Sequence, residues 1–251
     1  MKTIFITGAT AGFGKAIAYT FAQHAWRLIL NGRRQDRLEA LATELRNDYG
    51  ADVLTLPFDV RDREAVVQAI RNLPHEWKWV DLLVNNAGLA SGLSTIQEGD
   101  FADWDVMLDT NVKGLLNVFR CIAPTMVERG QGHIINIGSI AGKQTYLRGN
   151  VYCATKAAVN ALSEAMRIDM LPHGIRVTQI CPGAAETEFS LVRFKGDAER
   201  AKQAYAGYKP LTAQDIADIV YFAATRPGHV VLNDIVVTPL AQASPYYMHK
   251  G

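Results

Sequence analysis

Cysteine is scarce in this chain. Its 251 residues include three cysteines, Cys121, Cys153 and Cys181, which lie far apart and never in a C-x-x-C arrangement. An odd number of widely spaced cysteines argues against a disulfide framework and against a zinc site. The six histidines also lack metal-ligand spacing, so we expect no metal site. This cysteine usage is typical of a reducing compartment, and we expect a cytoplasmic location.

The chain also has little excess charge and no long apolar run. Lysine and arginine total 26 against 25 aspartates and glutamates, which gives a net charge of +1. Such a balance argues against nucleic acid or a membrane surface as a partner. No stretch of eighteen apolar residues is present, so we expect no membrane-spanning helix. The apolar run at the start is too short for a secretory signal.

What the chain does contain is a regular alternation of short apolar runs and amphipathic segments. The apolar runs predict seven strands, at Ile4–Thr7, Leu28–Leu30, Val53–Phe58, Leu82–Val84, Ile134–Ile137, Ile175–Ile180 and Ile235–Val237. The amphipathic segments predict helices at Gly14–Ala25, Arg37–Leu45, Glu64–Ile70, Trp104–Met126, Val151–Met170 and Ala213–Ala224. This alternation predicts a parallel sheet covered by helices on both faces. We therefore expect an α/β fold, a doubly wound Rossmann domain with a parallel seven-stranded sheet.

A glycine-rich loop, Thr7-Gly8-Ala9-Thr10-Ala11-Gly12-Phe13-Gly14, joins the first strand to the first helix. Gly8 permits a tight turn, Gly12 lets the backbone approach a pyrophosphate, and Gly14 allows close helix packing. A plain strand-to-helix turn is the alternative, and the spacing of the first two glycines differs from the commonest Rossmann pattern. The position directly after the first strand favours a dinucleotide site, contacted by Gly8, Thr10, Ala11, Gly12, Phe13 and Gly14. The length of the chain suits one sizeable α/β domain, and we expect residues 1–251 to form a single dinucleotide-binding catalytic domain.

Two adjacent arginines, Arg33 and Arg34, follow the second strand. An NAD site usually places a carboxylate there to bind the ribose 2′-hydroxyl, but the first acid is Asp36, which we expect inside the next helix. Two guanidiniums suit a 2′-phosphate by charge and by forked geometry. The alternative is a pair of solvated arginines at a helix start, where the helix dipole slightly disfavours positive charge. Arg33 and Arg34 therefore favour NADP over NAD.

The next two strands also end in residues that suit a cofactor. Asp59 and Val60 follow the third strand, and Asp59 either contacts the adenine edge or caps the following helix. Asn86, Ala87 and Gly88 end the fourth strand, where small side chains let the chain pass close to a ligand.

Tyr152 and Lys156 are four residues apart in a predicted helix, and Ser139 lies thirteen residues upstream of Tyr152. The four-residue spacing places the phenol and the ammonium on one helix face. A nearby ammonium favours the phenolate, so we expect Lys156 to lower the pKa of Tyr152 and to make it a proton donor and acceptor nearer pH 7. The Ser139 hydroxyl could hold a substrate carbonyl or alcohol.

Taken together, the motifs resemble those of the short-chain dehydrogenase/reductase family. The matching pieces occur in the family's order and cover the chain from residue 3 to about 238: Thr7 to Gly14, Asn85 to Gly88, Asn111, Ser139, Tyr152 to Lys156, and Pro182-Gly183. The resemblance implies a catalytic tetrad of Asn111, Ser139, Tyr152 and Lys156. In it, Tyr152 exchanges the proton, Lys156 holds the nicotinamide ribose, Ser139 positions the carbonyl, and Asn111 holds a water that relays protons to Lys156. The resemblance also places Pro182, Gly183 and Thr187 against the cofactor.

Within the family, the segments Gly8–Gly14, Gly32–Arg34, Asn136–Ser139 and Val192–Asp197 resemble the NADP-dependent 3-hydroxy acid dehydrogenases. Those enzymes act on serine, allo-threonine and related short hydroxy acids. The stretch Ala185–Phe189 also resembles the sulfoacetaldehyde reductases, which form isethionate. The resemblance therefore implies a small anionic hydroxy acid or aldehyde as substrate, interconverted with its carbonyl or alcohol form, and leaves carboxylate and sulfonate open.

Two segments fall outside the alternating pattern, residues 186–210 and the tail 239–251. Both follow strands, and ligands of open parallel sheets bind beyond the strands' carboxyl ends. We expect 186–210 to form a substrate lid in which Arg193 binds the substrate anion bidentately, a solvated loop arginine being the alternative. Tyr146 either lines the substrate pocket with its hydroxyl or packs in its wall. Weaker candidates for the pocket are Arg148, Lys195, Gln242 and Tyr246.

Further hypotheses concern assembly and function class. The resemblance implies a homodimer or homotetramer paired through the Trp104–Met126 and Val151–Met170 helices. A protein that senses NADP without catalysis is a different-class alternative, although such proteins commonly lose the tyrosine or lysine. A reductase of larger lipid or sugar carbonyls is a third hypothesis, which the short Gln144–Val151 segment and Arg193 disfavour.

Overall fold

Seven parallel strands form the centre of the molecule, and the computed structural model describes residues 1–251. Their order across the sheet is β3-β2-β1-β4-β5-β6-β7. The strands are β1 Thr3–Ile6, β2 Arg27–Gly32, β3 Val53–Pro57, β4 Leu82–Asn85, β5 Gly132–Ile137, β6 Ile175–Pro182 and β7 Asp234–Val237. Every strand overlaps a predicted one, and every pairing in the sheet is parallel. The predicted α/β fold class with seven strands is confirmed.

Nine α-helices connect the strands and cover the sheet. They are α1 Gly12–Gln23, α2 Gln35–Tyr49, α3 Arg63–Arg71, α4 Phe101–Leu108, α5 Leu115–Arg129, α6 Asn150–Met170, α7 Glu188–Arg193, α8 Ala198–Gln203 and α9 Ala213–Ala224. The bounds predicted for α9 coincide with those observed, and the other predicted helices differ by a few residues at their ends. None of the helices has the length and apolar character that crossing a bilayer requires.

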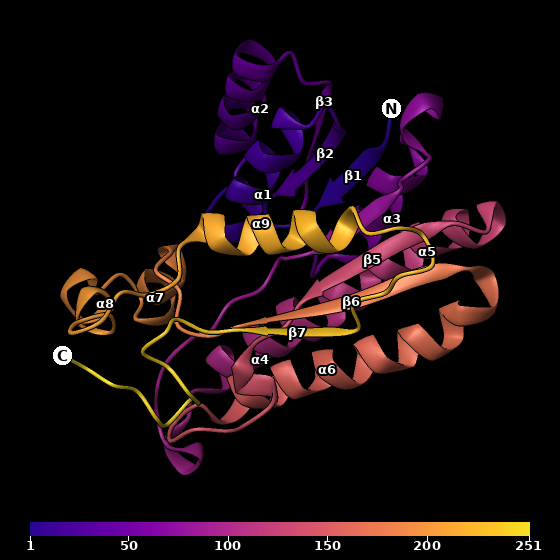
Figure 1. The fold of residues 1–251 in the computed structure, drawn as a ribbon. Helices are drawn as coiled ribbons and strands as arrows, with labels where there is room; N and C mark the ends of the chain where they lie inside the picture. Colours follow the sequence, from indigo (N-terminus) through magenta and orange to yellow (C-terminus); the bar gives the residue numbers. More distant parts are fainter.

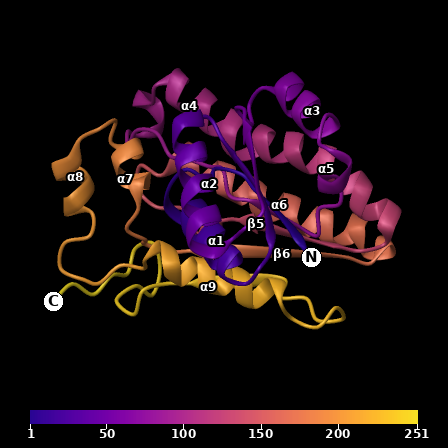
Figure 2. The ribbon, with the colours of Figure 1, turned by 90° about the horizontal axis from the view of Figure 1, so that it is seen from above.

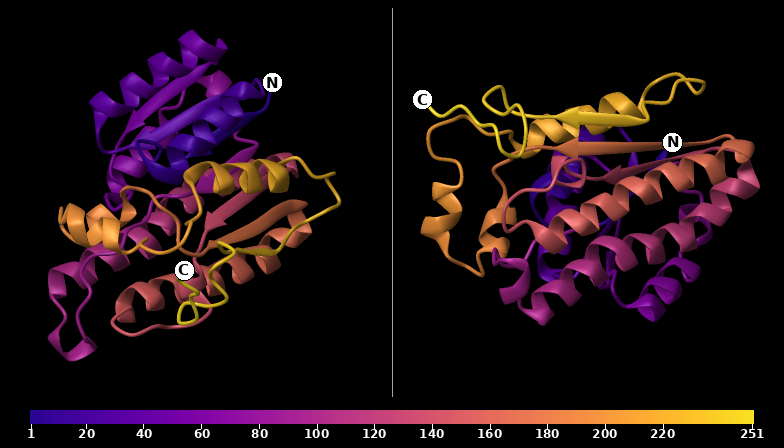
Figure 3. Two further views of the ribbon diagram at one scale, coloured as in Figure 1. Left: turned by 60° about the vertical axis from the view of Figure 1, so that its left-hand side comes forward. Right: turned by 90° about the horizontal axis from the view of Figure 1, so that it is seen from below.

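The helices form two layers, one on each face of the sheet. Helices α1, α2 and α9 pack on one face, and α3, α5 and α6 pack on the other. Figure 2 shows α1 and α9 on the side of the sheet opposite α5 and α6, and the right-hand view of Figure 3 shows the same division. Because both faces are covered, central strands such as β1, with the sequence TIFI, are buried at every position.

The predicted helix Trp104–Met126 is interrupted. It begins earlier, at Phe101, and a π-helical turn at Asp109–Gly114 separates α4 from α5. Asn111 lies in this turn, and its side-chain amide exchanges two hydrogen bonds of 2.8 Å with the backbone of Leu89. Hydrophobic spacing carries no signal for such an insertion, which occurs frequently at functional sites.

Segment 186–210, predicted as a lid, contains the two short helices α7 and α8. Figure 1 shows them projecting beyond the carboxyl ends of the strands, with the C-terminus beside them. Thr187 begins α7 by accepting a hydrogen bond from Phe189 N, and Asp197 caps α8 in the same way at Arg200 N. The N-cap aspartate of α3 is Asp62, which accepts from Ala65 N. The helix-capping alternative for Asp59 is therefore wrong.

Candidate active site

A cavity of about 510 Å³ opens beyond the carboxyl ends of the strands. Its volume is within the usual range of about 300 to 1,000 Å³ for small-molecule and cofactor sites. The predicted cofactor and catalytic residues and the two main substrate candidates, Tyr146 and Arg193, all line it except Gly14 and Asn111. The structure thus brings into one cavity residues that are far apart in the chain.

The glycine loop at one end of this cavity has the backbone that the sequence predicts. Gly8 and Gly12 have φ values of 66° and 51°, in the region that favours glycine. At Gly14, a Cβ atom would lie 2.3 Å from the carbonyl oxygen of Gly8. Gly14 is therefore a packing residue, and no part of it lines the cavity. The side-chain amide of Asn86 supports the loop by donating hydrogen bonds of 2.8 and 3.1 Å to the carbonyls of Thr7 and Gly8.

Arg33 and Arg34 follow β2 and line the cavity. Arg34 donates a 2.9 Å hydrogen bond to Thr10 in the glycine loop, and its guanidinium lies 3.5 Å from the Glu188 carboxylate. Asp36 lies in the first turn of α2, as predicted, and no carboxylate follows β2 directly. The two arginines thus lie at this end of the cavity together with the Glu188 carboxylate.

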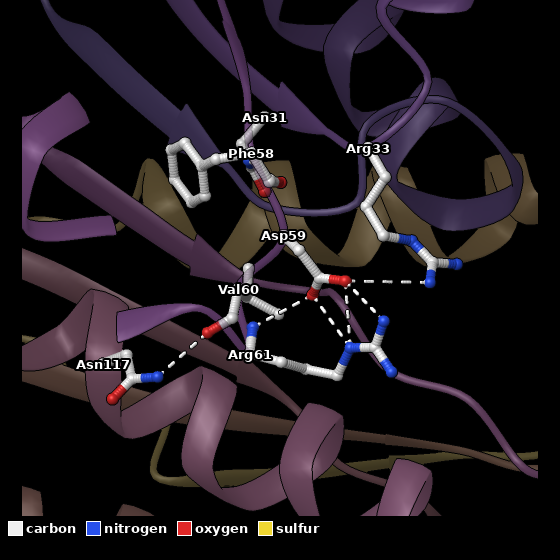
Figure 4. Close-up of polar contacts among 7 residues, drawn as sticks. All are labelled: Asn31, Arg33, Phe58, Asp59, Val60, Arg61 and Asn117. Carbon is white, nitrogen blue, oxygen red and sulfur yellow. Dashed lines mark hydrogen bonds and ion pairs between the residues drawn. The ribbon is translucent and has the colours of Figure 1, made fainter. Parts of the chain in front are cut away.

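Asp59 follows β3 and forms an ion pair with Arg61, as Figure 4 shows. The distance is 2.6 Å from Arg61 Nη2 to Asp59 Oδ2, and Arg61 Nε lies 2.9 Å from the same oxygen. Burial alone raises the pKa of Asp59, but the hydrogen bonds from Arg61 and the charges of Arg61 and Arg33 outweigh it and lower that pKa. The carboxylate is thus held charged at the cavity wall. Next to it, Val60 accepts a 3.0 Å hydrogen bond from Asn117.

These features fit a phosphorylated dinucleotide. The loop has no side chain where a pyrophosphate would approach Gly8 and Gly12. Two guanidiniums stand beyond β2, where the ribose 2′ position of such a cofactor is read.

Tyr152, Lys156 and Ser139 also line this cavity. The two α6 residues are one turn apart and are 8% and 6% exposed, and Ser139, which only Gly138 separates from β5, is 9% exposed. Lys156 Nζ donates a 2.9 Å hydrogen bond to the carbonyl of Ile137. Ser139 Oγ accepts a 3.1 Å hydrogen bond from Ala141 N.

The pKa of Tyr152 differs from the sequence prediction. Burial raises this pKa well above its ordinary value, and the charge of Tyr146 acts in the same direction. A hydrogen bond with Ser139 and the charge of Arg193 lower it, but they do not outweigh burial. Burial also lowers the pKa of Lys156 to about 8. The expectation that Lys156 lowers the pKa of Tyr152 is therefore wrong, because both groups are buried and burial disfavours each charged form.

Asn111 lies behind the cavity wall and within reach of the lysine. A Cβ atom on Gly88 would lie 3.2 Å from Asn111 Oδ1 and 3.5 Å from Lys156 Nζ. The absence of a side chain at Gly88 thus leaves the two polar groups facing one point. Besides Leu89, Asn111 Nδ2 donates to Thr155 Oγ1 at 3.0 Å, which connects the π-helical turn to α6.

Arg193 and Tyr146 form the wall next to Tyr152. Arg193 Nη1 donates to the Tyr146 hydroxyl at 2.8 Å, and its guanidinium carbon lies 5.7 Å from the ring centre of Tyr152. The Nε atom of Arg193 is buried without a hydrogen-bond partner. A guanidinium with a buried and unpaired Nε donor beside a phenol suits a small anion.

The remaining predicted residues separate into those at the cavity and those outside it. Pro182, Gly183, Thr187 and Gln242 line it, and Gln242 accepts a 2.8 Å hydrogen bond from Ala184 N. Arg148 lines a smaller adjacent cavity with Tyr152 and Arg193. Tyr246 is 61% exposed and outside both cavities, and Lys195 pairs with Asp103 at 3.0 Å. Tyr246 and Lys195 are therefore wrong as pocket residues.

Sequence reasoning missed other residues at the cavity. Phe189 on α7 packs against Tyr152 with ring centres 5.5 Å apart. Glu188 lines the cavity, and Arg37 contacts it at 3.2 Å. The sequence shows acidic and aromatic residues in Glu186–Phe189, but their positions at the cavity become apparent only when α7 is seen to be helical.

Comparisons with known proteins agree with this architecture. A family model described as short chain dehydrogenase matches residues 2–197. The chain is 47% identical over 241 residues to the NADP-dependent 3-hydroxy acid dehydrogenase YdfG of Salmonella typhi, covering 96% of each protein. It is 46% identical over 241 residues to sulfoacetaldehyde reductase 2 of Chromohalobacter salexigens, covering 96% of this chain and 95% of that one.

Solved structures are similar over the same span. The closed form of serine dehydrogenase complexed with NADP+ matches with a TM-score of 0.93 and 43% identity, covering 99% of this chain and 100% of that chain. Serine dehydrogenase from Escherichia coli matches with a TM-score of 0.83 and 40% identity, covering 96% of this chain and 99% of that chain. The family resemblance drawn from the motifs is confirmed: this protein belongs to the short-chain dehydrogenase family of oxidoreductases.

Proposed function

We propose that this protein is an NADP-dependent oxidoreductase that interconverts a short 3-hydroxy acid, of the serine, allo-threonine or 3-hydroxypropionate type, with its carbonyl form. The observation that carries the proposal is the position of Arg193. Its guanidinium lies 5.7 Å from the Tyr152 ring, so an anion bound there is held beside the phenol. A 3-hydroxy acid has a carboxylate and a reacting carbon only two bonds apart, which suits this short spacing.

The residues at the nucleotide end support NADP as the cofactor. Gly8, Gly12 and the first amides of α1 would hold its pyrophosphate, and Arg33 and Arg34 its 2′-phosphate. Asp59 would contact the adenine edge, and Thr187, at the start of α7, would contact the cofactor from the lid. The further predicted contacts come from Thr10, Ala11, Phe13, Val60, Asn86, Ala87, Gly88, Pro182 and Gly183, and Gly14 supports the loop by packing. When bound, NADP supplies the hydride acceptor or donor.

Tyr152 is the group that moves the proton. A buried tyrosine whose pKa is raised stays protonated at neutral pH, so its hydroxyl is a donor to a substrate carbonyl during reduction. In the oxidation direction these steps run in reverse: the phenol proton first leaves toward Lys156, and the phenolate oxygen then accepts the alcohol proton. Ser139 holds the substrate oxygen next to the phenol.

Lys156 and Asn111 replenish that proton. The pKa of Lys156, about 8, is close to working pH, so its ammonium can both release and take up a proton. Gly88 leaves room between Lys156 and Asn111 Oδ1 for a water. This tetrad is complete, which supports an enzyme over a protein that only senses NADP.

Arg193 and Tyr146 hold the substrate anion. The arginine presents a forked donor set, and Tyr146 fixes its orientation through the 2.8 Å hydrogen bond. Because Arg193 belongs to α7, anion binding also holds residues 186–210 over the substrate as a lid, which excludes water from the reacting atoms.

The second candidate function is reduction of sulfoacetaldehyde to isethionate. Two sulfoacetaldehyde reductases of Chromohalobacter salexigens are each 46% identical to this chain. A sulfonate has the charge and the oxygen atoms that Arg193 needs, and isethionate has the same short separation between anion and hydroxyl carbon. The proposed fold, cofactor and proton path are identical for both substrates.

Steady-state kinetics on a matched panel test the proposal. Serine, L-allo-threonine, 3-hydroxypropionate and isethionate are compared, each with NADP+ and with NAD+. A kcat/KM that is highest for the carboxylates with NADP+ is expected. A kcat/KM concentrated on isethionate would establish the second candidate, and turnover of none of the four would refute both.

We also infer assembly into a homodimer or homotetramer through α4, α5 and α6. Large apolar side chains on these helices are exposed: Leu108 is 42%, Leu116 37% and Ile168 67% exposed. Pairing two copies would bury them. Light scattering of the purified protein gives the mass directly, and a monomer would contradict this inference.

A further inference from the structure

Two carboxylates stand at the nucleotide end of the cavity, and each contacts two arginines. Asp59 is 3.9 Å from Arg33 and 2.6 Å from Arg61. Glu188 is 3.5 Å from Arg34 and 3.2 Å from Arg37. In both cases the shorter contact is with the arginine that is further along the chain.

The four arginines differ in what else they reach. Arg33 and Arg34 line the cavity, as do both carboxylates, whereas Arg37 and Arg61 do not. Arg61 holds Asp59 through Nε and Nη2, and Arg37 Nη1 contacts both oxygens of Glu188 at 3.2 and 3.3 Å. Figure 4 shows the first arrangement, with Arg61 and Arg33 approaching Asp59 from different sides. Each carboxylate therefore has one arginine at the cavity and one outside it.

This division matters for a 2′-phosphate, which carries a charge of roughly −1.5 to −2. A carboxylate nearby repels the phosphate and competes with it for the same guanidinium. If Arg34 were the sole partner of Glu188, binding the phosphate would leave a carboxylate unpaired next to a second anion. Arg37 removes this conflict because it neutralises Glu188 while Arg34 turns to the phosphate.

We propose that Arg37 and Arg61 are positioning residues that determine the preference for NADP over NAD: they hold the Glu188 and Asp59 carboxylates, so that Arg34 and Arg33 are free for the 2′-phosphate. Neither residue lines the cavity that would hold the cofactor. Their effect is selective for the phosphorylated cofactor, since NAD has a hydroxyl at this position and gains nothing from free guanidiniums.

Arg37 has a competing structural explanation, because Glu188 belongs to α7. Thr187 next to it lies against Gly12, where an added Cβ would meet the Thr187 Cβ at 3.4 Å. The Arg37–Glu188 pair could therefore act only by fastening α7 over the glycine loop. In that case, removing either partner weakens the lid equally and affects both cofactors alike.

The test is a double-mutant cycle on cofactor binding. Arg37→Ala, Glu188→Gln and the double variant are compared with the wild type by titrating NADP+ and NAD+ against the cofactor-free protein, in buffer of low ionic strength. Binding is measured by calorimetry, which is independent of turnover. Arg71→Ala serves as the matched control, since it removes the same charge from the exposed end of α3.

The proposal predicts that Arg37→Ala raises the Kd for NADP+ by about three- to tenfold, the range of a lost exposed ion pair or somewhat more. The Kd for NAD+ should change less than twofold. Glu188→Gln in the Arg37→Ala background should restore the Kd for NADP+ to near the wild-type value, because no carboxylate is left to neutralise. Arg71→Ala should leave both constants unchanged.

Two results would overturn the proposal for Arg37. One is an equal loss of NADP+ and NAD+ affinity, and the other is a double variant that binds NADP+ no better than Arg37→Ala. Either would assign Arg37 to fastening α7.

Arg61 is tested in the same way by comparing Arg61→Ala with Arg61→Ala/Asp59→Asn. The measured quantity there is the ratio of the Kd for NAD+ to the Kd for NADP+, because a change in adenine binding affects both constants equally and cancels in the ratio. An unchanged ratio in Arg61→Ala would overturn the proposal for that residue.

Discussion

Arg193 donates a 2.8 Å hydrogen bond to the hydroxyl of Tyr146, and this contact joins helix α7 to the segment that precedes α6. The two residues are 47 positions apart in the chain. Their contact brings the proposed anion site against Tyr152, with the Arg193 guanidinium over both phenol rings. In the proposed mechanism, substrate binding, lid position and proton transfer are coupled through this one side chain.

Replacing this arginine should impair substrate binding more than chemistry. Arg193→Lys keeps the charge but loses the forked donor set, so we expect KM for a 3-hydroxy acid to rise by about 10- to 100-fold, the range of a lost charge-assisted hydrogen bond. The Kd for NADP+ should stay near the wild-type value. Tyr146→Phe removes only the acceptor that orients Arg193 and should raise KM by less than about tenfold. An unchanged KM in Arg193→Lys would show that the anion binds elsewhere.

The glycine loop gives a prediction about backbone contacts. In Gly14→Ala the new methyl group would lie 2.3 Å from the carbonyl oxygen of Gly8, so α1 must move away from the loop. We expect a stability loss of about 1 to 3 kcal/mol, typical of overpacking, and weaker NADP+ binding. Gly228→Ala is the control, because its Cβ would meet no atom within 4 Å. Denaturant unfolding and cofactor titration measure both effects, and equal stability of the two variants would contradict the prediction.

His133 on β5 should make stability depend on pH. It is 3% exposed, its Nε2 lies 2.8 Å from Thr178 Oγ1, and burial lowers its pKa from 6.5 to about 3. Between these two values the unfolded chain binds more protons than the folded protein, so stability falls as the pH decreases through this window. From pH 7 to pH 5 the free energy of unfolding of the wild type should therefore fall by about 2 kcal/mol more than that of His133→Gln. Parallel denaturant titrations of both proteins at the two pH values measure this difference, and identical pH dependences would refute it.

The fold and much of the cavity lining follow from local sequence. Strands such as β1 and helices such as α9 are visible because burial of both sheet faces produces short apolar runs and amphipathic repeats. The nucleotide end is also local, since the Gly8–Gly14 loop and Arg33-Arg34 each follow one strand directly. Such features need no knowledge of distant contacts.

The features that the sequence did not indicate depend on long-range contacts. The π-helical turn at Asn111 goes together with hydrogen bonds to Leu89, 22 residues away. The raised pKa of Tyr152 results from burial, which spacing to Lys156 does not reveal. Glu188 pairs with Arg37, which is 151 positions away, and only the folded chain shows that they meet.

The most direct test of the central claim concerns Tyr152. If its hydroxyl transfers the proton, Tyr152→Phe should bind NADP+ within about twofold of the wild type and lose kcat by at least about a thousandfold, consistent with loss of an essential acid–base group. Cofactor titration and steady-state turnover of the best substrate in the panel measure the two quantities on the same preparation. Turnover within tenfold of the wild type, with cofactor binding intact, would contradict the account and assign proton transfer to another group.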